Sequence, residues 1–547
     1  MTDPSVPVRN LSIATLFVAL LADACVRRPA SSVQARLADA SVTRQSVGAF
    51  ERNERAFAVS RSADSAYFNK TYSVAAELYA GVAQDFRDPV LGHYNAARAF
   101  ALAGRPAEAV KELKLALRAG YRRTAEMQRE DDLASLRGGA PWPRLVAIAA
   151  DNQRAFQRAH ADPARAKIVT SDIDHFWRAY DLAATRATPD ERADAYRREY
   201  FDPGSAGLLD YYSTKIYSVE NFVQVIDTHP RYYASLRPSS LRVAAQEAPI
   251  RAAFRKMKAL YANATFPDVY FVMGSLMAAG TVSDLGLLLG VDQSTAALDS
   301  PRDELIPTLR ARVRGVDELA PIVAHELVHF QQKRGGAYSL LRGVLTEGSA
   351  DFIGELISGR HTNAQAQAFG NAHEAEVWRR FEHDMHSASA RDWIGNGLSN
   401  SVSDAWVADL GYYVGYQIAK AYYERAADKR QAIRDLLEDH DPDEILRASG
   451  YAARFPPEPI EGERRGVPAE RVFVRHINGC GRTSVTAMAA PPEYRSPGRR
   501  RHLAWSEGRR QFFRTSRDAH LPCRSKRTSS VSFFSAASFV YAMWPPS

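Results

Sequence analysis

The sequence of 547 residues predicts an α+β protein that is mostly helical, with a small β-sheet and a short helical repeat domain in front. Three observations predict this fold class. Helical periodicity with an internal repeat runs through residues 66–150. Within the largest unit, residues 160–455, a stretch rich in β-branched and aromatic residues at 269–289 indicates strands. From about residue 317 the pattern is helical again, and strands followed by helices are typical of segregated elements.

The N-terminus is typical of an export signal, which residues 1–25 would form. Arg9 precedes an apolar run at residues 11–22, and small residues follow at the cleavage positions. The run is too short to span a bilayer comfortably, so we expect a protein of the periplasm or cell envelope. A hydrophobic helix that stays attached is the alternative. Cys25 could be acylated and tether the protein to a membrane, although Asp23 fits the lipobox of lipoproteins poorly.

The segment at residues 66–150 resembles a degenerate pair of tetratricopeptide repeats, and residues 26–65 before it are predicted to be a linker. Phe100 and Gly104 stand where such a repeat places its aromatic residue and its turn glycine. Pro89 separates the two repeat units. Repeats of this kind bind peptides or partner proteins, so a protein partner is expected here. A helical cap that only packs on the main domain is the alternative.

The net charge of +8 belongs to the end of the chain. Residues 465–547 contain 15 Lys and Arg against 4 Asp and Glu, whereas the rest of the chain contains 56 and 59. The main body is near neutral and has no basic stripe interleaved with aromatics, so we predict no nucleic-acid partner. Residues 456–547 show no amphipathic period and are predicted to be a disordered basic tail. A frameshifted reading of the end of the gene is the alternative.

The sequence HELVH places His325 and His329 four residues apart, in the pattern HExxH. On a helix this spacing puts both imidazoles on one face, about one turn apart, where they can share a metal ion. Asp317 is expected to cap this helix, and Gly335 with the following glycine to end it. The three cysteines form no CxxC pair, so His and carboxylate side chains must hold any metal.

Glu347 is the expected third ligand, in a second helical stretch that ends near Gly359. A catalytic zinc needs three protein ligands and one open position for water. Asp351 follows four residues later and therefore shares a helix face with Glu347. There it can accept the second N–H of a ligating histidine, which fixes the tautomer.

HExxH followed by Glu347-x-x-x-Asp351 resembles the gluzincin class of zinc metallopeptidases, and about half of the chain resembles a family of predicted bacterial zinc proteases. The resemblance implies a zincin-like domain that hydrolyses a peptide bond in a peptide or protein substrate with a water activated by Zn²⁺. It implies that the metal ligands are His325, His329 and Glu347. Glu326 would be the general base, and Asp351 would be the carboxylate that orients a ligating histidine. Glu326 would take the proton of the water and deliver it to the leaving amine.

Other assignments around this site stay open. Tyr412 is the candidate catalytic donor to the oxyanion, with Tyr413 and Tyr416 as rivals, and all three could simply be buried packing residues. Residues 269–273 could be an edge strand that pairs with an extended substrate, or an ordinary core strand. Three histidines among charged residues are predicted to lie on a solvated helical face: His373, His383 and His386.

Two rival functions remain beside the exported zinc metallopeptidase. One is a protein-binding or scaffold protein that works through its repeats and has a structural or inactive metal site. The other is a zinc hydrolase of a non-peptide amide, such as cell-wall material. The intact Glu326 favours hydrolysis, because a non-catalytic zinc site needs no base.

Overall fold

The computed structural model describes residues 48–85, 88–333, 335, 337–390, 392–396, 406–438 and 440–456, and the pairs 476–477 and 483–484. The predicted signal peptide with Cys25 and most of the predicted tail lie outside the described residues. The chain divides into two compact units. The smaller unit, residues 457–534, contains the short antiparallel pair β5 (His476–Ile477) and β6 (Thr483–Ser484). All other elements belong to the larger unit.

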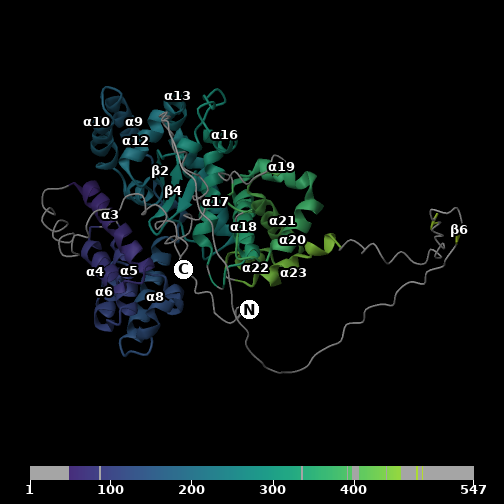
Figure 1. The fold of residues 1–547 in the computed structure, drawn as a ribbon, viewed down its shortest axis with the longest axis horizontal. Helices are drawn as coiled ribbons and strands as arrows, with labels where there is room; N and C mark the ends of the chain where they lie inside the picture. Colours follow the sequence, from purple (N-terminus) through teal and green to yellow (C-terminus); the bar gives the residue numbers. More distant parts are fainter. Residues whose placement is uncertain are drawn as a thin grey trace. The chain divides into compact units, whose positions relative to one another are not determined.

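The N-terminal part of the larger unit is a series of helices packed on one another (Figure 1). They are α3 (Ala49–Phe68), α4 (Tyr72–Val82), α5 (Pro89–Leu102), α6 (Pro106–Arg118), α7 (Thr124–Arg129), the 3₁₀ turn η1 (Asp131–Leu136) and α8 (Trp142–Ala159). Buried alanines allow the helices to approach closely, and Gly104 turns the chain between α5 and α6 with a φ of +73°. The helices predicted for residues 66–150 are present, and their assignment as tetratricopeptide repeats stays a prediction.

Helix α3 corrects the predicted linker, because residues 49–65 are helical. Phe50 is buried and stacks on Phe201 of the main domain, with ring centroids 4.8 Å apart. The Tyr212 hydroxyl donates a hydrogen bond of 2.9 Å to Glu54. Ala63 of α3 packs in one cluster with the next helix, α4, whereas the apolar contacts of Phe50 come from residues about 150 positions further along the chain, which no local periodicity indicates.

A four-stranded mixed sheet lies at the centre of the main domain, in the order β1-β2-β4-β3. The strands are β1 (Ile168–Val169), β2 (Asp268–Val272), β3 (Gly280–Val282) and β4 (Gly286–Gly290). Strands β1, β2 and β4 are parallel, and β3 runs antiparallel to β4 with Thr281 opposite Leu288. Strand β2 therefore lies inside the sheet, which favours the core-strand alternative for residues 269–273. Gly280 is the first residue of β3.

Short helices rich in tyrosine pack against the sheet, and they precede the HExxH motif in the sequence. They are α9 (Ser171–Ala183), α10 (Pro189–Tyr196), η3 (Arg197–Phe201), α11 (Ala206–Tyr211), η4 (Tyr212–Ile216), α12 (Val219–Thr228), α13 (Pro230–Ser235), α14 (Arg237–Ser240), η5 (Val243–Gln246) and α15 (Glu247–Leu260). Buried tyrosine hydroxyls tie these helices to the ends of the strands. The Tyr200 hydroxyl contacts the Met273 backbone at 2.7 Å, and that of Tyr211 donates to the Ala278 carbonyl at 2.8 Å.

The C-terminal half of the domain is helical, as predicted. It contains α16 (Pro307–Arg312), α17 (Leu319–Gln331), α18 (Leu340–Ser358), α19 (Ala364–Ala372), α20 (Glu374–Asp384), α21 (Leu410–Arg425), α22 (Lys429–Leu437) and α23 (Pro442–Ser449). Helix α18 packs on α17 on one side and on α21 on another. Gly348 and Gly415 form the α18–α21 contact, where an added β-carbon on Gly348 would lie 2.0 Å from the Gly415 backbone.

The expected ends of the HExxH helix are wrong. Asp317 lies in the 3₁₀ turn η7 (Val316–Glu318), so α17 begins at Leu319 with no side-chain cap, and it ends at Gln331, before Gly335. The predicted end of the second helix is confirmed, because Gly359 caps α18 with a φ of +85°. The mostly helical α+β class is also confirmed, whereas its zincin-like character stays a prediction. Among the described residues, no helix has the length and apolarity to cross a membrane.

Candidate metal centre

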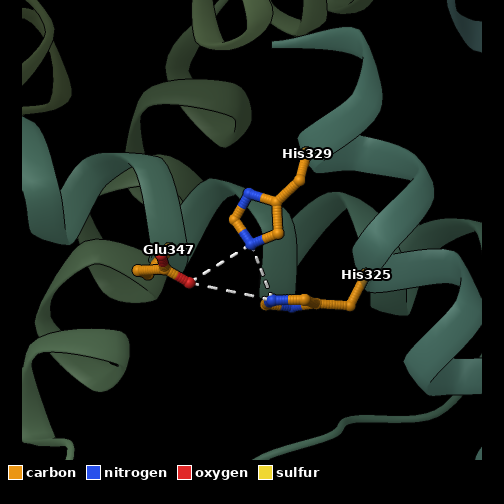
Figure 2. Close-up of side chains that lie close together, drawn as sticks. All are labelled: His325, His329 and Glu347. Atoms are coloured by element: carbon orange, nitrogen blue, oxygen red, sulfur yellow. Dashed lines mark hydrogen bonds and ion pairs between the residues drawn. The ribbon is translucent and has the colours of Figure 1, made fainter. Parts of the chain in front are cut away.

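Three predicted ligands converge between α17 and α18 (Figure 2). His325 Nε2 and His329 Nε2 are 2.9 Å apart, and Glu347 Oε2 lies 3.2 Å from the second and 3.8 Å from the first. All three side chains are buried. Ligand atoms about 2.1 Å from a tetrahedral zinc ion are about 3.4 Å from each other, so the observed distances bracket the value that zinc requires.

The hydrogen bond at Nδ1 of each histidine determines that Nε2 of the same ring faces the centre. His325 Nδ1 lies 2.8 Å from Asp351 Oδ1, and an ionised carboxylate only accepts hydrogen bonds. His329 Nδ1 lies 2.8 Å from Gln332 Oε1. The amide of Gln332 is held in this orientation, because its Nε2 donates to the Thr346 carbonyl at 2.8 Å. Both Nδ1 atoms therefore carry a proton, and in the neutral rings both Nε2 atoms present a lone pair to the centre.

The centre thus collects acceptors, which suits a cation. Glu347 Oε2 is buried and accepts no hydrogen bond, and a buried polar atom without a partner costs about 1–3 kcal/mol. Two imidazole nitrogens and one carboxylate oxygen are ligands that Zn²⁺ takes readily. The residues present therefore fit the predicted ion.

Charges around the centre shift the pKa values of its members. Burial alone would lower the pKa of His325, but Asp351 overrides it and raises this pKa to about 9. Burial would likewise raise the pKa of Glu347, yet His329 and His325 lower it overall. Without a metal ion, His325 therefore carries a proton near neutral pH and supplies the positive charge that the carboxylates need.

Glu326 lies beside the ligands in a tight and charged environment. Burial raises its pKa, and the neighbouring His325 and Lys215 oppose that rise. A β-carbon on Gly280 of β3 would come within 2.5 Å of Glu326 Oε1, so only glycine allows this approach. Lys215, in the π-helix η4, is buried, and burial lowers its pKa to about 8. No local pattern in the sequence points to Lys215 or to the role of Gly280, because both are remote from the motif.

The three candidate tyrosines lie at different distances from the ligands, and the remaining three candidate histidines lie on the surface. The ring of Tyr412 stacks 6.2 Å from that of His325, and Tyr412 contributes to the lowered pKa of Glu347 after the two histidines. Tyr413 packs against Gly370, and Tyr416 donates to Glu355 at 2.7 Å, so neither contacts a ligand. The three histidines predicted to be solvated are exposed, which confirms that prediction: His373, His383 and His386.

The family comparison covers the part of the chain that contains this centre. The model of a lipoprotein family described as gliding motility protein GldB matches residues 162–453, just over half of the chain. The chain belongs to the GldB family. No curated protein and no solved structure matches the chain. The match includes both helices of the metal centre and leaves out the N-terminal helices α3 to α8.

Membership of the GldB family corrects the functional prediction. The identification as a gluzincin or bacterial zinc protease is wrong. The predictions of a metallopeptidase activity and of a peptide substrate, which depended on that identification, are wrong as well. The scaffold alternative fits the family better. The physical reason for the error is that HExxH spacing sets the geometry of two ligands on a helix and does not set a reaction. The catalytic roles of Glu326 and Tyr412 rested on that enzyme, whereas the metal ligands do not depend on it.

Proposed function

We propose that this chain is a lipoprotein of the cell envelope that serves as a scaffold in a gliding motility machinery and binds protein partners. The observation that carries the proposal is the family match across residues 162–453. The family is one of lipoproteins, which supports the predicted export signal. Cys25, at the end of that signal, is the residue that would be acylated.

Partner binding is assigned to the N-terminal helices. Two large apolar side chains are exposed there, Val74 on α4 at 38% and Leu91 on α5 at 51%. The same region is fixed to the main domain at its other end, where Arg122 and Arg123 bind Asp284 at 3.0 and 3.1 Å. A firmly attached helical array with exposed apolar residues suits a docking platform.

The metal centre has a structural role in this proposal. A zinc ion held by His325 and His329 of α17 and by Glu347 of α18 would join two helices that pack on each other. An ion that binds only the folded chain stabilises it by about 4 kcal/mol when its concentration is about a thousand times its Kd. The convergence of three acceptors supports this role.

Complementation with two variants tests scaffold function against turnover. In a strain that lacks the chromosomal copy, we expect Glu326→Gln to restore gliding as well as the wild type, because this substitution keeps all three ligands. His325→Ala should fail, because it removes one ligand. The proposal is contradicted if Glu326→Gln is folded and holds zinc but does not restore gliding.

Site-specific crosslinking tests the docking platform. A photo-crosslinking residue at Leu91 should capture a partner in the envelope, and the same residue at Leu298, which is fully exposed in the main domain, serves as control. Equal capture at both positions, or capture at Leu298 alone, would place the partner elsewhere.

A further inference from the structure

A loop of residues 360–363 holds Asp351, the carboxylate that hydrogen-bonds His325. Neither the family match nor the HExxH motif gives this loop a role. Asp351 Oδ1 accepts hydrogen bonds from His325 Nδ1 at 2.8 Å and from the Thr362 hydroxyl at 2.6 Å. Its Oδ2 accepts one from Asn363 Nδ2 at 2.6 Å. Asp351 is only 1% exposed, so these side chains take the place of water around a buried carboxylate.

The loop reaches Asp351 because the chain reverses at the end of α18. Gly359 adopts the left-handed conformation that this reversal requires, and residues 360–363 then fold back along the helix by about two turns. Arg360 fixes the loop to the start of α17, where it donates to the Asp317 carbonyl at 3.0 Å and pairs with Glu318. The loop therefore touches both helices that carry the metal ligands.

The other contacts of Asn363 determine how its side chain is oriented. The Asn363 backbone N–H donates to His361 Nδ1 at 2.9 Å, and the side-chain Oδ1 of Asn363 accepts from Arg314 Nη2 at 3.5 Å. The side-chain amide group of Asn363 is therefore left to point at Asp351. With both of its oxygens occupied, Asp351 has one orientation, and that orientation directs Nε2 of His325 to the centre.

We propose that Thr362 and Asn363 are positioning residues of the metal centre, which hold Asp351 so that His325 is fixed as a ligand before the metal arrives. The inference rests on the proposed zinc site. Removing an outer partner of a metal ligand typically weakens metal binding by about 10–100-fold. Asp351 is that outer partner, and Thr362 and Asn363 each supply it with a donor that nothing else among its described contacts replaces, so we expect the lower end of that loss, about 10-fold, from either residue.

The test compares matched variants of the full chain. Thr362→Val keeps the shape and removes the hydroxyl, Thr362→Ser keeps the hydroxyl, and Asn363→Asp replaces a donor by a second carboxylate. Ser358→Ala is the control, because the Ser358 hydroxyl bonds only Arg360 of the same loop. Zinc affinity is measured by competition with a chromogenic chelator, and the melting temperature of each protein is measured without metal. The proton on His325 Nδ1 is followed by NMR in the metal-free proteins.

We expect Thr362→Val and Asn363→Asp to bind zinc about 10-fold more weakly, with an altered His325 Nδ1 proton signal. Thr362→Ser and Ser358→Ala should stay within about threefold of the wild type. Thr362→Val also leaves the buried Asp351 one donor short, so its metal-free melting temperature should fall; the altered His325 Nδ1 signal, together with rescue by Thr362→Ser, separates positioning from a purely structural role. Wild-type affinity in folded Thr362→Val and Asn363→Asp overturns the inference and leaves the zinc site standing. A wild type that binds no zinc overturns both.

Discussion

Substituting Gly348 by alanine is expected to disturb the metal centre through the helix that carries it. Gly348 directly follows the ligand Glu347, at the point where α18 contacts α21. A β-carbon there would lie 2.0 Å from both the carbonyl carbon of Gly415 and the backbone nitrogen of Tyr416. Carbon atoms in contact need about 3.5 Å, so the two helices would have to separate by about 1.5 Å.

The size of the effect follows from the rigidity of that contact. Overpacking a core costs about 1–3 kcal/mol, and we expect the upper end, because backbone atoms cannot rotate away as a side chain can. Each kcal/mol lowers the melting temperature by about 2–4 °C in a domain of 150–250 residues, so Gly348→Ala should lower it by about 6 °C or more. Zinc affinity should fall as well, because Glu347 moves with α18.

Thermal unfolding followed by circular dichroism measures the first effect, and chelator competition the second. Gly343→Ala, on the same helix, is the control: its β-carbon would meet only the side chains of Tyr338 and Ile394, and Tyr338 is partly exposed and can move. A Gly348→Ala protein that melts within about 2 °C of the wild type and binds zinc equally well would refute the reasoning.

Three further predictions concern the attachment of the helical array, the pH dependence of stability, and proton release. Arg122 pairs with Asp284, and its guanidinium lies 3.9 Å from the centroid of the Phe156 ring. Arg122→Ala should therefore lower the free energy of unfolding by about 1–2 kcal/mol and speed proteolysis near residue 122. Unchanged proteolysis would contradict this prediction. Burial raises the pKa of Asp292 to about 6 in the folded chain, so its contribution to stability is full below the unfolded pKa of about 4 and is lost as the pH rises through 6. The free energy of unfolding of the wild type relative to Asp292→Asn, measured in urea, should therefore rise by up to about 3 kcal/mol between pH 7 and pH 4, and a constant difference would count against the buried carboxyl. Zinc binding at pH 7 should release about one proton, because the surrounding carboxylates raise the pKa of the metal-free His325 to about 9. Calorimetry in two buffers of different ionisation enthalpy measures the release, and no release would mean that His325 is already neutral in the metal-free chain.

The sequence predicts most of what local pattern controls. The strands near residues 269 and 286 and the buried helix from Leu319 follow from composition and periodicity. His325, His329 and Glu347 come together because a spacing of four on one helix and a second helix nearby suffice to assemble them.

What the sequence does not predict depends on contacts between distant segments. Helix α3 is ordered by Phe201 and Tyr212, and the two-residue strand β1 exists only through its pairing with β2. Lys215 reaches Glu326 from a π-helix more than a hundred residues earlier. Thr362 and Asn363 contact Asp351 only because Gly359 reverses the chain.

The functional error has a different origin. The geometry of HExxH was predicted, and the side chains do lie side by side, but a ligand arrangement is compatible with a structural ion as well as with a catalytic one. The family match, which spans residues 162–453 rather than the motif alone, overturns the identification as a metallopeptidase.

The measurement that tests the central claim most directly is the zinc content of the purified chain together with its melting temperature before and after chelation. The account predicts about one zinc per chain, lost in His325→Ala, and a lower melting temperature when a chelator removes the ion from the wild type. A chain that contains no zinc even after zinc is supplied, or whose melting temperature does not change when the ion is removed, would contradict a structural metal joining α17 and α18.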